Sequence, residues 1–174
     1  AEQVKAQVVK KRAVVAESSA EVKRIPPPQL FDLTTLQREA NRKFGYSADK
    51  TLKLAQALYE RHKLLTYPRT DSRYLSDDML PKVKSTLSRL PEPYAALVRA
   101  PEMNPNMHTK RFYDNDKISD HHAIVPTEKL PNLDSLSADE RNIYDLVVRR
   151  LIAAHYSNYE YEAAKIITEC EGHK

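Results

Sequence analysis

The stretch DLTTLQREANRKFGYSADKTLKLAQALYERHKLL, residues 32–65, decides the fold because its pattern predicts two helices joined by a tight turn. Thr34 or Thr35 is suited to cap the first helix, and Gly45 is placed to end it. Ser47 can cap a second helix at once. This arrangement is a helix-turn-helix, which binds DNA in some proteins but more often only packs.

The hydrophobic period changes upstream of these helices. Residues 4–8 alternate apolar and polar, and residues 13–16 form a short apolar run, so we predict two strands there. The three prolines in IPPPQL, residues 25–30, remove backbone donors and forbid a helix. This segment is therefore an extended connector and a candidate domain boundary.

Downstream, LSADERNIYDLVVRRLIAAHY predicts the clearest helix in the chain. Ser137 and Glu140 fit a capping box at its start, and an apolar stripe follows. A short strand is expected at residues 123–125, and the tail after residue 156 predicts one or two more strands.

The expected fold class is α+β and mainly helical, with a CAP-like helix-turn-helix in a helical domain that is inserted between β-strand segments of a second domain. The boundaries that we expect are residues 1–28 for the first part of the β domain, 29–154 for the helical domain, and 155–174 for the return segment.

Composition excludes several classes of protein. The 174 residues are 41% hydrophobic and 30% charged, which suits a folded chain with a core, and the net charge of +4 is compatible with an anionic partner. The single cysteine, Cys170, excludes a disulfide framework and predicts a reducing, cytoplasmic location. Two glycines leave no phosphate-binding loop, and no apolar run is long enough to span a membrane. Both ends have the character of cut ends, which predicts a piece of a larger protein.

The segment LLTYPRTDSRYLSD, which begins at Leu64, holds a candidate nucleophile. Pro68 favours an extended chain, in which Tyr67 and Arg69 project to the same side. The guanidinium would favour the phenolate and stabilise charge on a phosphate. Short hydroxyl donors suited to phosphate oxygens flank this pair at Thr66, Thr70 and Ser72. A tyrosine before a proline is also a common packing residue, and that alternative stays open.

A second cluster lies in SDHHAIVPT, residues 119–127. His121 and His122 are adjacent, so in an extended chain they point to opposite faces and do not form a helical metal pair. Asp120 is able to orient an imidazole, and one histidine is able to donate to a phosphate. A local hydrogen bond is the commoner role of such an Asp-His pair.

Lysines, arginines and tyrosines alternate between residues 38 and 74, with Lys63 and Arg73 on either side of Tyr67. Phosphate contacts and base stacking use such groups. A solvated helical face with snorkelling lysines is the alternative interpretation.

The chain resembles the type IA DNA topoisomerases, most closely the topoisomerase III branch, in three motifs. In order and with matching spacing, these are PPPQLFDLTTLQREANRKFGYSADKTLKLAQALYE, LLTYPRTDSRYLSDDM and SDHHAIVPT. The string TYPRTDS fits the active-site signature of that family. The resemblance implies that Tyr67 opens one DNA strand and keeps its 5′ phosphate, that Arg69 contacts the scissile phosphate, and that His121 lies near it. Further DNA-binding residues are expected at Thr66, Thr70, Ser72, His122, Arg73 and Lys63.

The chain departs from the family at the metal site. The family holds Mg²⁺ on an Asp-x-Asp-x-Glu group in a separate toprim domain, and Asp114-Asn115-Asp116 lacks the third acid. The resemblance therefore implies no metal or other cofactor in this chain and Mg²⁺ in the full-length enzyme. Its partners would be single-stranded DNA and the toprim-bearing part of the polypeptide, and the chain alone would be inactive. The alternative is a helix-turn-helix DNA-binding module without covalent chemistry, which predicts salt-dependent duplex binding and no covalent adduct.

Overall fold

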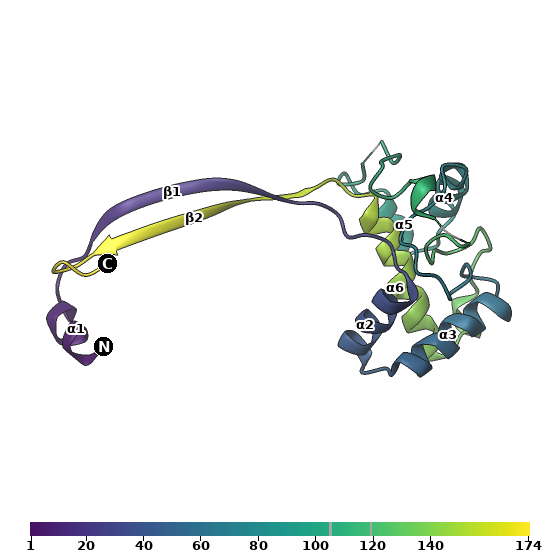
Figure 1. Ribbon diagram of the computed structural model, residues 1–174, viewed down its shortest axis with the longest axis horizontal. Coiled ribbons are helices and arrows are strands. Elements are labelled where there is room, and N and C mark those ends of the chain that lie inside the picture. Colours follow the sequence, from purple (N-terminus) through teal and green to yellow (C-terminus); the bar gives the residue numbers. More distant parts are fainter. Residues whose placement is uncertain (105, 119) are drawn as a thin grey trace. The chain divides into compact units, whose positions relative to one another are not determined.

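The computed structural model describes residues 1–104, 106–118 and 120–174 (Figure 1). The chain divides into two compact units, the first made of residues 1–26 and 158–174 and the second of residues 27–157. The second unit is thus inserted in the sequence of the first. No helix in the described ranges is long and apolar enough to cross a membrane.

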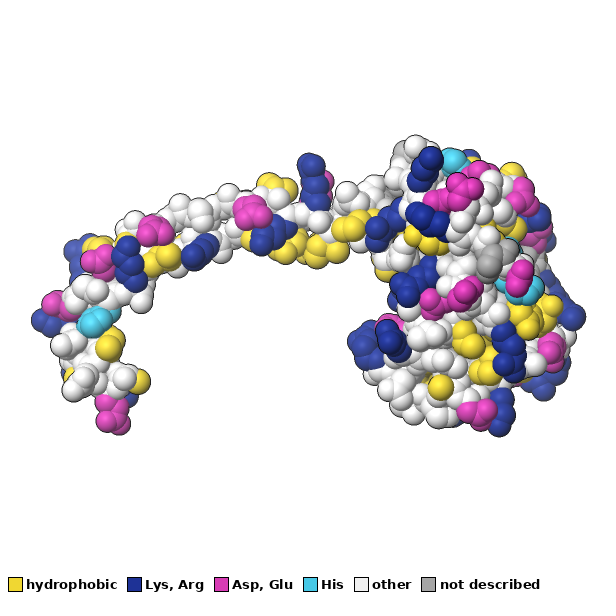
Figure 2. Space-filling view, viewed as in Figure 1, with side chains coloured by type: hydrophobic (Ala, Val, Ile, Leu, Met, Phe, Trp, Pro, Cys, Tyr) yellow, Lys and Arg dark blue, Asp and Glu magenta, His cyan; other side chains and the backbone are white. Residues whose placement is uncertain are grey.

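The first unit is a helix and a two-stranded antiparallel ribbon. Helix α1 spans Glu2–Val8, strand β1 spans Val14–Ile25, and strand β2 spans Tyr159–Glu169. Every residue of β1 is exposed, and Figure 2 shows hydrophobic side chains lying open along the ribbon among charged ones. The strand that we predicted at residues 4–8 is wrong: this segment is α1. The segment is rich in alanine, lysine, glutamine and glutamate, which are good helix formers, and this propensity outweighs the alternation of apolar and polar residues on which the strand prediction rested.

The helices of the second unit are α2 (Leu33–Phe44), α3 (Ala48–Glu60), α4 (Met79–Ser88), α5 (Tyr94–Val98) and α6 (Ala138–Ala154), with short 3₁₀ turns η1 at Asn115–Lys117 and η2 at Leu133–Ser135. The chain is therefore α+β and mainly helical, as expected. Helices α2 and α3 form the predicted helical pair. Gly45 ends α2 with φ of +68°, in the left-handed region that favours glycine. The Ser47 hydroxyl caps α3 by accepting from the Lys50 backbone N–H at 3.1 Å.

The start of α2 corrects our prediction that Thr34 or Thr35 is its N-cap. Asp32 is the N-cap, and its carboxylate accepts from the Thr35 backbone N–H at 2.6 Å. Thr35 is the third helical residue, and its hydroxyl accepts from the Asp32 backbone N–H at 3.2 Å. An aspartate is as good a cap as threonine, so the reciprocal bonds decide which residue begins the helix.

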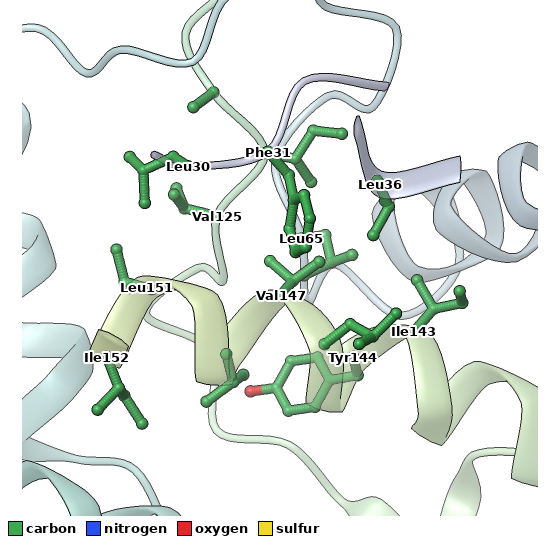
Figure 3. Close-up of a cluster of buried hydrophobic side chains, with 14 of the residues drawn as sticks. Leu30, Phe31, Leu36, Leu65, Val125, Ile143, Tyr144, Val147, Leu151 and Ile152 are labelled. Atoms are coloured by element: carbon green, nitrogen blue, oxygen red, sulfur yellow. The ribbon is translucent and has the colours of Figure 1, made fainter. Parts of the chain in front are cut away.

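Helix α6 forms the centre of the core. The predicted capping box is confirmed, because Ser137 accepts from the Glu140 backbone N–H and the Glu140 carboxylate accepts from Ser137 in return. Figure 3 shows Val147 and Leu151 pointing from α6 toward Phe31 and the neighbouring segments, while other side chains of α6 point the opposite way. The helix is therefore buried on more than one side, as a central helix must be.

Residues 123–125 are buried, but they form no regular strand. Isolated bridges join Phe31 to Ile124 and Leu65 to Pro126. Each neighbouring segment pairs for only one or two residues, so the strand that we predicted is replaced by single bridges. These bridges hold the connector, the Tyr67 segment and the histidine segment side by side.

Candidate active site

The backbone before Tyr67 is fixed by the segment that follows the two histidines. The Thr66 backbone N–H donates to the Val125 carbonyl at 3.0 Å, and the Thr127 N–H donates to the Leu64 carbonyl at 2.9 Å. The Thr66 hydroxyl donates to the Ala123 carbonyl at 3.1 Å and accepts from the Val125 N–H at 3.0 Å. These four bonds hold Tyr67 at a fixed place against the histidine segment.

Tyr67 itself lies between two rings. Its ring centroid is 4.4 Å from that of His121 and 5.5 Å from that of Tyr59, which meets it edge-on. Tyr67 is half-buried, and among the described residues its hydroxyl has no hydrogen-bond partner. The side chain lines a cavity of about 250 Å³ together with Asp120, His121 and His122. Tyr67 is therefore not sealed in the core, which is where a packing tyrosine would satisfy its hydroxyl.

Arg69 is exposed, and its Nη2 lies 3.5 Å from Oε1 of Gln56 on α3. Gln56 and Tyr59 are three residues apart on α3, so they share one face of that helix. Tyr67 and Arg69 thus both contact the same face of α3. Within the described part of the chain no direct contact joins the two side chains.

The hydroxyls that we expected to meet phosphate oxygens have intramolecular partners. Thr70 and Ser72 are buried. The Thr70 hydroxyl donates to the His121 carbonyl at 3.1 Å, and the Ser72 hydroxyl donates to the Lys117 carbonyl at 3.1 Å. With the bonds of Thr66, they tie the Tyr67 segment to residues 117–125. Their common effect is to bring His121 to Tyr67.

The two basic residues beside this segment differ in their surroundings. Arg73 donates from Nε to the Asp32 carboxylate at 2.7 Å, which ties the site to the N-cap of α2. Burial raises the pKa of Asp32, but hydrogen bonds from Thr35 and Arg73 lower the pKa by more, so it lies below its ordinary value. Lys63 is exposed, with its Nζ 5.7 Å from the ring centroid of Tyr59. Lys63 is the freer of the two cations for an anionic ligand.

His122 lines the same cavity as Tyr67 and His121. Its Nδ1 donates to the carbonyl of Ala123 at 2.8 Å, and the residue is half-buried. This bond fixes the orientation of the ring, so Nε2 is the nitrogen left for a ligand.

Sequence reasoning missed Tyr59 and Glu140. Tyr59 was grouped only with the apolar face of its predicted helix and with the tyrosines between residues 38 and 74 that could stack on bases, whereas its ring packs on Tyr67. Glu140 was read only as the capping-box residue, but its carboxylate also contacts Arg61 and His62, just before the Tyr67 segment. Sequence spacing does not reveal the contact of Glu140 with Arg61 and His62, because these residues are far apart in the sequence and only the fold brings them together.

The chain is similar to known DNA topoisomerases in both sequence and structure. A family model described as DNA topoisomerase matches residues 1–174. DNA topoisomerase 3 of Bacillus subtilis is 47% identical over 163 residues, which cover 93% of this chain and 22% of that protein. DNA topoisomerase 3 of Bacillus cereus is 46% identical over 164 residues, with 92% and 22% covered. Full-length topoisomerase I from Thermotoga maritima has a similar structure, with a TM-score of 0.71 and 27% identity, covering 100% of this chain and 28% of that one. The chain spans 22% of the length of the curated relatives that it matches.

Proposed function

The chain belongs to the type IA DNA topoisomerases, in the topoisomerase III branch, and from this premise we propose that Tyr67 is the nucleophile of a transient single-strand break. The observation that carries the proposal is the place of Tyr67: its ring packs on His121, it lines a cavity, and its hydroxyl has no partner among the described residues.

The proposed step is a transesterification. A bond forms between Tyr67 Oη and the phosphorus as the bond from phosphorus to the 3′ oxygen breaks, so the 5′ phosphate stays on the protein. His121, whose ring packs on Tyr67, would pass the phenolic proton to the leaving 3′ oxygen. Arg69 would stabilise the phosphoryl oxygens, and the 3′-hydroxyl would later reverse the step. The phosphodiester energy is kept in the tyrosine ester, so resealing needs no ATP.

We assign the hydroxyls of Thr66, Thr70 and Ser72 a positioning role, because each already donates to a backbone carbonyl of the segment that carries His121 or of the 3₁₀ turn η1 before it. Lys63, Arg73 and His122 remain candidates for DNA contact. Helices α2 and α3 would act as a helix-turn-helix that binds DNA next to Tyr67, because Tyr67 and Arg69 both contact α3.

The residues that the structure describes do not fit the Mg²⁺ that the family resemblance implies for the full-length enzyme. Across the described ranges, no group of three or more histidine, cysteine, aspartate or glutamate side chains is placed to hold a metal ion. The carboxylate of Asp114 is instead paired with Lys117 at 3.0 Å. We propose that the toprim-bearing part of the polypeptide supplies the metal ion and that this chain alone does not relax DNA.

The test is covalent trapping on single-stranded DNA with Mg²⁺, using the full-length topoisomerase that contains this chain. We expect a protein–DNA adduct that Tyr67→Phe abolishes. Tyr59→Phe is the matched control, because it removes a neighbouring phenolic hydroxyl and leaves the ring that packs on Tyr67. An adduct that survives Tyr67→Phe would rule out this nucleophile. Salt-dependent duplex binding with no adduct in any variant would favour a non-catalytic helix-turn-helix module instead.

A further inference from the structure

A second cavity of about 240 Å³ adjoins the Tyr67 cavity. Helix α4 contributes Met79, Val83 and Thr86 to its wall, and the segment after the histidines contributes Pro126 and Glu128. His122 lines both cavities, and Thr66 lines the second cavity while its neighbour Tyr67 lines the first. A strand held at Tyr67 would therefore pass close to the second cavity.

The chemistry of the walls suits a nucleobase. Met79, Val83 and Pro126 offer apolar surface to the faces of a planar ring, and a thioether sulfur favours contact with aromatic edges. The volume lies below the range of about 300–1,000 Å³ that is common for drug-sized ligands, which fits one ring system rather than a whole nucleotide.

Two polar groups of this cavity lack partners within the described part of the chain. Thr86 is 5% exposed and lines the cavity, and its hydroxyl makes no hydrogen bond there, so this hydroxyl is available to a ligand in the cavity. The exposed carboxylate of Glu128 makes no hydrogen bond or ion pair there. A carboxylate only accepts hydrogen bonds, so it requires a donor on the ligand. Lys82, also in the wall, is only loosely paired with Asp78 at 3.8 Å and suits the phosphate of the same nucleotide.

We propose that this cavity binds one unstacked base of the DNA strand held at Tyr67, and that it prefers a base with an exocyclic amino group. Glu128 accepts from the amino group, Thr86 bonds to a ring nitrogen, and the apolar walls replace the stacking that the base gives up. The inference rests on the proposed function, since it uses the strand that Tyr67 would cleave, but it concerns recognition and not the covalent step.

The experiment compares oligonucleotides that differ by one amino group. Deoxyadenosine is replaced by deoxynebularine, which lacks only the 6-amino group, at each of three positions on either side of the cleaved bond. We measure covalent adduct formation by the full-length topoisomerase that contains this chain. At one position we expect deoxyadenosine to be favoured by about tenfold, as is typical of a good base contact.

Glu128→Met should reduce that preference to less than about threefold, and Thr86→Val should weaken it while cleavage of the other positions is unchanged. Glu102→Met is the matched control, because Glu102 is also an exposed glutamate of the second unit and lies outside both cavities. No preference at any position, or a preference that survives Glu128→Met, would overturn the proposal. If no adduct forms on any oligonucleotide, the proposed function fails separately, and fluorescence anisotropy of the 174-residue chain with the same oligonucleotides decides the question of the cavity.

Discussion

Replacement of Glu140 by glutamine should destabilise the second unit and do so in a pH-dependent way. Glu140 is 4% exposed on α6. One carboxylate oxygen accepts from the Ser137 backbone N–H at 2.9 Å and from its hydroxyl at 2.7 Å, and the other contacts Arg61 and, at 3.2 Å, Nε2 of His62. The carboxylate therefore joins the start of α6 to the end of α3, just before the chain enters the Tyr67 segment.

The magnitude follows from the pKa. Burial raises the pKa of Glu140, but the hydrogen bonds of Ser137 and His62 and the charge of Arg61 outweigh it and bring the pKa from 4.5 to about 2. That difference corresponds to about 3 kcal/mol of the free energy of unfolding. Because the folded-state pKa is depressed, this stabilisation is fully present above pH 4.5 and is lost as the pH falls to about 2.

Urea denaturation followed by circular dichroism at 222 nm measures the effect, since the helices lie largely in the second unit. At pH 7 we expect Glu140→Gln to lower the free energy of unfolding by about 3 kcal/mol. The difference between the two proteins should shrink steadily below pH 4.5. Glu102→Gln, an exposed control, should change little at any pH. A cost that stays constant from pH 7 to pH 2.5 would show that packing, and not the charge, accounts for Glu140.

Two further substitutions test the turn and the support of the site. Gly45→Ala should lower stability by about 1 kcal/mol in urea denaturation through backbone strain alone, because no atom lies within 4 Å of an added Cβ, and Gly45→Asn should cost less. Thr66→Val should cost about 1–2 kcal/mol in the same measurement, because it removes the hydroxyl that bridges the backbone of Ala123 and Val125, whereas Thr66→Ser keeps this hydroxyl and should retain most of the stability. A loss in Thr66→Ser with Thr66→Val close to the unsubstituted protein would assign the effect to the methyl group.

The sequence predicts those parts of the fold in which local chemistry and tertiary packing agree. Ser137 and Glu140 predict the start of α6, and Gly45 predicts the end of α2. Both predictions succeed because capping bonds and a left-handed turn involve only residues that are close together in the sequence. Residues 4–8 failed for the opposite reason. Alternation predicts a strand only where a partner strand and a buried face exist, and the segment that became α1 buries no residue.

The site could be predicted only as a set of residues, not as an arrangement. The sequence motifs identify Tyr67 and His121 as candidates, but they do not predict the hydrogen bonds that hold the two segments together. Thr66 and Thr70 have short hydroxyls that suit phosphate and backbone carbonyls equally well, and only the fold shows that carbonyls of the histidine segment take them. Tyr59 could not be singled out, because a tyrosine on an apolar helical stripe is normally a packing residue.

The contacts with α3 connect the helical pair to the proposed chemistry. Pro68 separates Tyr67 from Arg69, and each of the two meets α3 through a residue of the same face, Tyr59 for the tyrosine and Gln56 for the arginine. Residues three apart on one helix lie next to each other on the same face. A displacement of α3 would therefore carry both catalytic candidates together and keep their spacing to a phosphate, whereas His121, which is held by hydrogen bonds from the Tyr67 segment, would follow through Thr70. The helical pair α2 and α3 and the proposed nucleophile would then move together rather than as two independent motifs.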